Sequence, residues 1–162
     1  SALTAQAASN GRFVLGIGLS HRPVVENFYK MEWRKPVRHM LDYLDILLPL
    51  LEQGSSNHEG EFFSYVGDGA RPTSNPPKVM LAALGDQMLR VAGRRTDGTI
   101  LWCVGPKTIE RQIKPAIDAA ADEAQDDRLG HELRQHVPAV RPDRHPDPDL
   151  ARALTDHVET TP

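Results

Sequence analysis

Residues 76–117, PPKVMLAALGDQMLRVAGRRTDGTILWCVGPKTIERQIKPAI, alternate twice between an apolar run and an amphipathic segment. In the first half, residues 78–83 form a compact apolar run that is typical of a buried strand. Gly85-Asp86 then opens a predicted helix over residues 86–95. The order strand, turn, helix predicts a βα unit.

The second half of this stretch repeats the order. After the turn at Asp97-Gly98, residues 99–104 are partly β-branched and aromatic, which predicts another strand. Gly105-Pro106 opens a predicted helix over residues 107–123, and we expect Pro115 to kink it.

A third unit precedes these two. Residues 12–17 predict a strand, and Pro36 opens a predicted helix over residues 36–52. Apolar residues recur along this helix at spacings of three and four, whereas Arg38, Asp42 and Asp45 occupy other faces. Three strands that alternate with helices predict an α/β fold with a parallel sheet.

Two segments lack this regular pattern. We interpret residues 55–77, rich in Gly, Ser, Asn and Pro, as a loop that carries a short extended segment and as a candidate lid. Every aromatic residue precedes Ala124, and residues 125–162 hold five prolines. We therefore predict a domain over residues 1–124 and a divergent, disordered tail rich in prolines and charges over residues 125–162.

Composition excludes several classes of protein. With a net charge of −3, 40% hydrophobic residues and no Lys/Arg block, neither a nucleic-acid partner nor a membrane partner is expected. The single cysteine, Cys103, excludes an internal disulfide and favours a cytoplasmic setting. Four of the seven histidines lie in the tail without helical pairing, so no metal site is predicted.

Glycines follow all three predicted strands, but none completes a known phosphate motif. Gly16 and Gly18 begin a GxGxxG pattern whose third position is His21, and Gly105-Pro106-Lys107-Thr108 has Pro where a Walker A loop needs Gly. Residues 82–86 and 104–108 run through Gly into helix N-termini, which favour an anion. Alternatively, these glycines only permit tight turns.

Four blocks of the chain carry a family resemblance. They are RFVLGIGLSHRPVVE (12–26), RKPVRHMLDYLDILLPLL (34–51), PPKVMLAALGDQMLRVAG (76–93) and TDGTILWCVGPKTIERQIKPAI (96–117). In this order they resemble the luciferase-like monooxygenase superfamily, and within it the oxidoreductases that use the deazaflavin coenzyme F-420. The resemblance ends near residue 124.

The resemblance implies a partial (β/α)8 TIM barrel. The three strands would be the fourth, fifth and sixth of eight, since a full barrel needs about 250 residues. A frameshifted, truncated or chimeric chain would produce such a fragment with an unrelated tail.

It also implies a function, namely hydride transfer between reduced coenzyme F-420 and an organic small-molecule acceptor. The alternatives are a flavin mononucleotide (FMN) monooxygenase, and a non-catalytic fragment that keeps at most a weak phosphate-binding loop and self-associates through exposed sheet edges. Ser20 and His21 are the implied catalytic residues, with His21 as proton relay or, alternatively, a solvated loop residue. The implied cofactor-binding residues are Gly18, Leu19, Ala82, Ala83, Leu84, Gly85, Trp102, Lys107 and Thr108.

Overall fold

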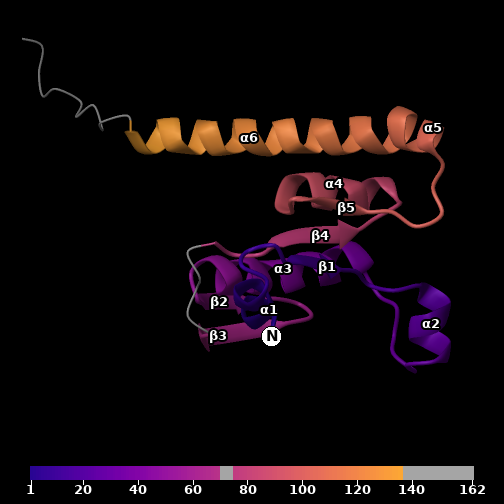
Figure 1. Cartoon of the computed structure of the whole chain (residues 1–162), viewed down its shortest axis with the longest axis horizontal. Coiled ribbons are helices and arrows are strands. Elements are labelled where there is room, and N and C mark those ends of the chain that lie inside the picture. Colours follow the sequence, from indigo (N-terminus) through magenta and orange to yellow (C-terminus); the bar gives the residue numbers. More distant parts are fainter. Residues whose placement is uncertain (70–74, 137–162) are drawn as a thin grey trace, which may run out of the picture. The chain divides into compact units, whose positions relative to one another are not determined.

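A computed structural model describes residues 1–69 and 75–136, and the chain divides into the units Ser1–Arg128 and Leu129–Pro162. The first unit contains a three-stranded parallel sheet of β1 (Val14–Ile17), β4 (Lys78–Ala82) and β5 (Gly98–Ile100), in the order β1-β4-β5 (Figure 1). The predicted parallel sheet is confirmed. β5 is shorter than predicted, because it ends at Ile100 instead of continuing to Val104.

The two connecting helices have the predicted bounds. α3 (Pro36–Glu52) joins β1 to β4 by way of a hairpin, and α4 (Asp86–Arg95) joins β4 to β5. Both helices start where the sequence signals a start, with Pro36 in the first turn of α3 and Gly85 as the N-cap of α4. Local signals therefore suffice to define these two elements.

Two short helices were not predicted. α1 (Ala2–Ala8) is held by Gln6, whose side-chain amide donates to the Asn75 carbonyl and accepts from the Phe13 N–H, both at 2.9 Å. α2 (Arg22–Asn27) begins directly after the loop that follows β1. Pro23 lies in the first turn of this helix, where proline is tolerated because its missing N–H would have no partner within the helix.

The region after β5 departs from a regular helix. It comprises α5 (Pro106–Thr108), a π-helical turn over Ile109–Ile113 and α6 (Lys114–His136). We predicted a kink at Pro115, and the structure has a π-helical turn immediately before this proline. Pro115 has no N–H to donate to the carbonyl four residues earlier, which disturbs the regular hydrogen bonding of the helix. Because α6 continues to His136, the prediction of a disordered tail from residue 125 is wrong for residues 125–136. Residues 137–162 lie outside the described part of the chain.

A β-hairpin lies over residues 55–68, within the segment 55–77 for which we predicted a loop with a short extended segment. β2 (Ser55–Glu59) and β3 (Ser64–Asp68) pair antiparallel, with His58 opposite Tyr65. β2 packs against α3, so a face of α3 that the sequence places in solvent is covered. The hairpin closes at Gly60, whose N–H donates to the Phe63 carbonyl at 3.0 Å.

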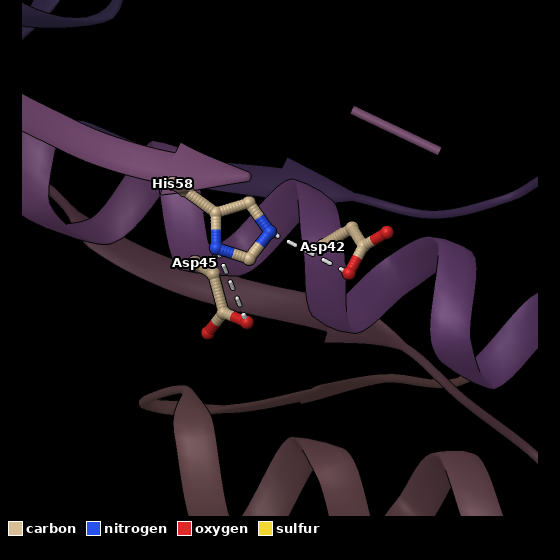
Figure 2. A group of neighbouring side chains, drawn as sticks. All are labelled: Asp42, Asp45 and His58. Carbon is tan, nitrogen blue, oxygen red and sulfur yellow. Dashed lines mark ion pairs between the residues drawn. The ribbon is translucent and has the colours of Figure 1, made fainter. Parts of the chain in front are cut away.

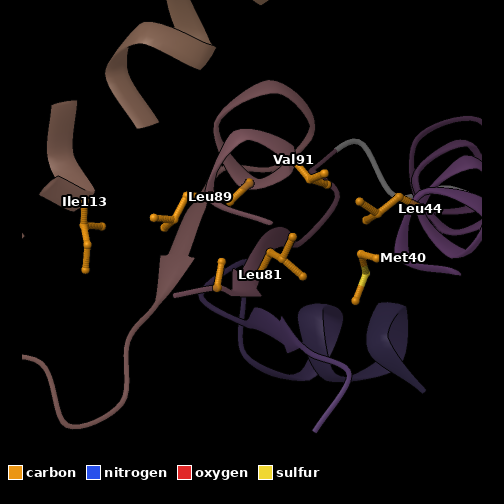
Figure 3. Packing of buried hydrophobic residues seen from close by; sticks show 8 residues of the cluster. Met40, Leu44, Leu81, Leu89, Val91 and Ile113 are labelled. Atoms are coloured by element: carbon orange, nitrogen blue, oxygen red, sulfur yellow. The ribbon is translucent and has the colours of Figure 1, made fainter. Parts of the chain in front are cut away.

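The core lies between α3, β4 and α4. It contains Leu44 of α3, Leu81 of β4 and Leu89 of α4, and Ile113 joins it from the π-helical turn (Figure 3). Burial alternates along β4, where Val79 and Leu81 are buried and their neighbours are more exposed. The helices therefore cover one face of the sheet, and the opposite face is more open.

Among the described residues, no helix is long and apolar enough to cross a membrane.

Candidate functional site

The carboxyl ends of the three parallel strands border a cavity of about 670 Å³. Parallel strands end at one edge of their sheet, so the loops that follow β1, β4 and β5 meet there. The lining residues come from these loops and from the starts of α3 and α4: Leu19, Ser20, His21, Trp33, Pro36, Val37, Ala82, Ala83, Leu84, Gly85, Asp86, Gln87, Met88, Ile100 and Trp102. Most of the site residues predicted from the sequence are in this lining.

The loop after β1 holds Ser20 and His21 at the cavity. It passes so close to β4 that a Cβ on Gly18 would lie 2.8 Å from the Cβ of Ala82, so this position requires glycine. Ser20 has a φ of 67°, in the left-handed region, which a residue with a side chain adopts at a cost of about 1–3 kcal/mol. The strained residue, Ser20, therefore lies between Leu19, to which the resemblance assigns cofactor binding, and His21, to which it assigns catalysis.

The loop after β4 leads directly into α4. Gly85 is the N-cap in an extended conformation, and no side chain caps the first backbone N–H groups of the helix. A Cβ on Gly85 would meet nothing within 4 Å. These N–H groups can donate to an anion, but the Asp86 carboxylate in the same turn opposes it.

The loop after β5 places Trp102 at the cavity. Trp102 is 72% exposed and lines the cavity, so it is not a core residue. Cys103 is exposed too, with a φ of 51°. Lys107 and Thr108 lie on α5, outside the cavity lining, so the structure does not bring them to the other predicted site residues.

A smaller pocket of about 300 Å³ adjoins the cavity and shares Leu19, Ser20, Trp33 and Pro36 with it. Its remaining lining comes from the loop after β1, α2, the segment that follows α2 and the first turn of α3: Gly18, Val25, Tyr29, Met31, Glu32, Arg34 and His39. Sequence reasoning missed this pocket. Its one signal is that Tyr29, Met31 and Trp33 alternate with polar residues just before Pro36.

A second group of interacting side chains lies between α3 and the hairpin. Figure 2 shows the His58 ring between two carboxylates, with Nε2 3.5 Å from Asp42 Oδ1 and Nδ1 4.0 Å from Asp45 Oδ2. A Cβ on Gly60 would lie 2.5 Å from His58 Nε2 and 2.6 Å from Asp42 Cγ, so the close packing requires glycine. Asp42 lies off the apolar stripe of α3, yet its side chain is completely buried, and the His58 side chain is largely buried beside it.

The surroundings of Asp42 favour its ionised form although the side chain is completely buried. Burial alone would raise the pKa of its carboxyl. The Phe62 N–H donates to Oδ2 at 2.8 Å, and Arg38 lies 2.8 Å from Oδ1. These two interactions, together with His58, outweigh the burial and lower the pKa below its ordinary value.

Three potential ligand atoms of Asp42, Asp45 and His58 lie within 4.8 Å of one another. The two nitrogens of His58 face different carboxylates, so one ion cannot use both contacts. The guanidinium groups of Arg38 and Arg95 already pair with the two carboxylates. This arrangement favours an ion-pair network that joins α3, α4 and the hairpin over a cation site.

A parallel sheet with a cavity at the carboxyl ends of its strands is typical of α/β proteins, among them the (β/α)8 barrels, and this chain has about three βα units. The profile of the luciferase-like monooxygenase family matches residues 1–156, and the chain belongs to this family.

Three similar proteins illustrate the relationship. The 5,10-methylenetetrahydromethanopterin reductase of Archaeoglobus fulgidus is 34% identical over 131 residues, which cover 76% of this chain and 38% of that protein. The structure of coenzyme F-420-dependent tetrahydromethanopterin reductase from Methanopyrus kandleri superimposes with a TM-score of 0.60 at 21% identity, covering 72% of this chain and 38% of that one. The structure of an F-420-dependent secondary alcohol dehydrogenase, in complex with an F-420–acetone adduct, superimposes with a TM-score of 0.57 at 19% identity, covering 75% of this chain and 38% of that one.

The two structural superpositions establish the fold. The chain spans 38% of the length of each of these three proteins. The family match runs past residue 124, where the resemblance in the sequence ends, and the domain boundary placed there stays a prediction.

Proposed function

We propose that this chain carries part of the cofactor site of an oxidoreductase that transfers hydride between reduced coenzyme F-420 and an organic acceptor. The observation that carries the proposal is the cavity at the strand ends, where Leu19, Ser20, His21, residues 82–85 and Trp102 line one space. Reduced F-420 would supply the hydride. The F-420 dependence named for both structural neighbours supports this cofactor, and FMN is the alternative that the family's monooxygenase description suggests.

The residues present fit such a cofactor in two respects. Leu19, Ile100 and Trp102 offer apolar and aromatic surface for a flat ring system. The uncapped N–H groups at the start of α4 suit an anionic group, although Asp86 weakens that site. Lys107 and Thr108 remain proposed contributors only if the cofactor extends beyond the cavity lining.

We assign the proton transfer to His21 and a positioning contact to Ser20. When the acceptor carbon gains a hydride, the atom bonded to it gains the electron pair and needs a proton. Imidazole can hold and give that proton near neutral pH, and the Ser20 hydroxyl can donate a hydrogen bond to the same atom. Both residues line the cavity, as these roles require.

Intrinsic fluorescence tests the proposal, because the chain has two tryptophans and both line the cavity. Coenzyme F-420 and FMN would be titrated separately into the chain. Saturable quenching by F-420 that is weakened in Trp102→Ala and kept in Arg22→Ala, a change outside the lining, would support the site. The absence of saturable change with either cofactor would refute it.

A second candidate is a non-catalytic fragment that associates with itself through its sheet. β1 and β5 are the edges of this sheet, and Val14 and Ile100 on them are exposed. Unpaired edges with apolar side chains favour pairing with another chain. Sedimentation velocity at several concentrations would show oligomers that Val14→Lys reduces if this candidate is right. For either candidate we propose a cytoplasmic setting, in which the exposed Cys103 stays reduced.

A further inference from the structure

Another pocket, which we call the amino-end pocket, lies at the edge of the sheet where the strands begin and has a volume of about 340 Å³. It borders Lys78, the first residue of β4, and the turn from α4 into β5, whereas the cavity borders the last residues of β4 and β5. The end of α3 and Arg128 of α6 complete its lining. None of the described residues that line it contributes to the cavity or to the smaller pocket, so it is a separate site.

Four cationic residues line the amino-end pocket: Lys78, Arg94, Arg95 and Arg128. Arg94 pairs with two carboxylates of α6, and Arg95 pairs with one of α3. A guanidinium group has more N–H donors than these pairs use, so both arginines can still donate to a ligand. Lys78 and Arg128 are exposed, and within residues 1–69 and 75–136 their side chains have no ion-pair or hydrogen-bond partner. A pocket that holds unpaired cations favours an anion.

The packing of α4 against α6 determines where these cations lie. A Cβ on Gly93 would lie 2.6 Å from the Ile117 carbonyl oxygen and 2.9 Å from the Cβ of Ala120, so the two helices approach as closely as a glycine allows. Arg94 Nη1 lies 3.3 Å from Glu123 Oε2 across the same contact. The end of α4, which carries two of the cations, is therefore held close to α6, which carries a third.

Two acidic residues also line the pocket. The Asp97 carboxylate accepts the Val79 N–H at 2.8 Å, which holds it against β4. Glu52 is exposed at the end of α3, and its carboxylate opposes an anion, as do the carbonyl groups at the end of α4. Four cationic against two acidic residues leave the lining positive, and the attraction grows with the charge of the ligand. A doubly charged anion therefore suits this pocket better than a singly charged one.

We infer that the amino-end pocket binds a small molecule that carries a phosphate group. Such a group has a charge of about −1.5 to −2 at neutral pH and several acceptor oxygens. Lys78 and Arg128 supply the unpaired positive charges, and the remaining N–H donors of Arg94 and Arg95 complete the contacts, since arginine binds phosphate through parallel hydrogen bonds. The inference does not depend on the proposed function.

The volume of the pocket indicates a ligand larger than inorganic phosphate. About 340 Å³ corresponds to about eleven groups the size of a water molecule, at roughly 30 Å³ each, which is more than a phosphate group fills. The affinity for the phosphate group itself is limited by solvent, because an ion pair with an exposed cation strengthens binding by up to about fivefold. We therefore expect a dissociation constant on the order of 10 mM for inorganic phosphate.

The test is a titration of the chain with sodium phosphate at pH 7, with the ionic strength held constant by sodium chloride. Amide resonances distinguish the two regions, since Thr96 and Asp97 line the amino-end pocket and Leu84 and Gly85 line the cavity. We expect saturable shifts at Thr96 and Asp97 whose dissociation constant is independent of any shift at Leu84 and Gly85. Acetate, which carries one charge, should bind at least fivefold more weakly than phosphate, on the order of one lost ion pair.

Substitutions in the lining should change the affinity in opposite directions. Lys78→Gln and Arg128→Gln should each raise the dissociation constant about fivefold, because each removes an unpaired cation. Glu52→Gln should lower it by about twofold to fivefold, because it removes the opposing charge. Arg90→Gln is the matched control, since Arg90 is an exposed cation of α4 outside the lining, and it should change the affinity less than twofold.

Several results would overturn the inference. They are the absence of saturable shifts at Thr96 and Asp97 up to about 100 mM phosphate, ten times the expected dissociation constant, and equal affinities for acetate and phosphate. Unchanged affinity in both Lys78→Gln and Arg128→Gln, or weaker binding in Glu52→Gln, would do the same. A failure of coenzyme F-420 to bind would refute the proposed function and leave this assignment unaffected, because the two sites share no lining residue.

Discussion

Replacing Asp42 by alanine should lower the free energy of unfolding by about 2–3 kcal/mol. The hydrogen bond from the Phe62 N–H to this ionised, fully buried carboxylate, 2.8 Å long, contributes about 1.5–3 kcal/mol. The ion pair with Arg38 adds at most about 1 kcal/mol, because the Arg38 side chain is half exposed and can regain water. Burying the carboxylate costs free energy that the alanine variant no longer spends, so the net loss of stability is smaller than the sum of these two contributions.

Asp45→Ala is the matched control, with the same chemical change one turn along α3. Asp45 is partly exposed and pairs with a partly exposed Arg95, so its loss should cost about 0–1 kcal/mol. Urea unfolding followed by circular dichroism separates the two. At a slope of about 2 kcal/mol per molar urea, the midpoint of Asp42→Ala should fall by about 1–1.5 M.

Acid dependence provides an independent reading of the same interaction. Burial raises the pKa of Asp42, but the Phe62 N–H, Arg38 and His58 together lower it by more than burial raises it. The folded-state pKa therefore lies below the ordinary 3.8. A lowered folded-state pKa contributes stability above pH 3.8 that is lost as the pH falls through the folded-state value. The difference between wild type and Asp42→Ala should therefore shrink below pH 3.8. A difference under about 0.5 kcal/mol at pH 7 would refute the reasoning, because surface substitutions reach that size.

Three further predictions test the core, the strained loop and the anion site. Leu44→Ala should cost about 2–5 kcal/mol in urea unfolding, whereas Leu84→Ala, at an exposed position, should cost less than about 1 kcal/mol, and equal costs would contradict the assigned core. Ser20→Gly should stabilise the chain by about 0.5–1 kcal/mol in thermal unfolding, since glycine adopts the left-handed φ without strain, and destabilisation would mean that the hydroxyl makes a stabilising contact. Phosphate should shift the amide resonances of Leu84 and Gly85, Gly85→Pro should abolish the shift and Gly85→Ala should keep it, whereas unchanged resonances at high phosphate would exclude the anion site.

The elements predicted well are those whose signals are local. α3 and α4 each have a start residue in sequence, Pro36 and Gly85, and an apolar stripe at helical spacing. β5 shows the limit of this reasoning. Residues 101–104 are apolar enough for a strand, but the pairing with β4 ends at Ile100, and Cys103 takes a left-handed φ in the loop that follows. Strand length here depends on the loop that follows, which no propensity describes.

The hairpin explains most of the errors at the surface of α3. Asp42 lies off the apolar stripe of the helix, and charged residues are rarely buried without a partner, so the sequence predicts that it is exposed. Its partners are separated from it in sequence by up to 20 residues, since the Phe62 N–H belongs to the hairpin turn. Only the tertiary contact between β2 and α3 brings them together.

In the candidate site, too, the residues placed by local signals could be predicted, and those placed by tertiary contacts could not. The residues at the ends of β1 and β4 could be predicted, because parallel strands place the loops at their carboxyl ends at one edge, whichever residues form them. Lys107 and Thr108 follow the next strand in the same way, yet they lie outside the lining because residues 101–105 form a loop between β5 and α5. The smaller pocket depends on α2 and on a bend held by the hairpin, both missed in the sequence. The framework of the site thus follows from the sheet topology, whereas the shape of the smaller pocket depends on the irregular segment between α2 and α3.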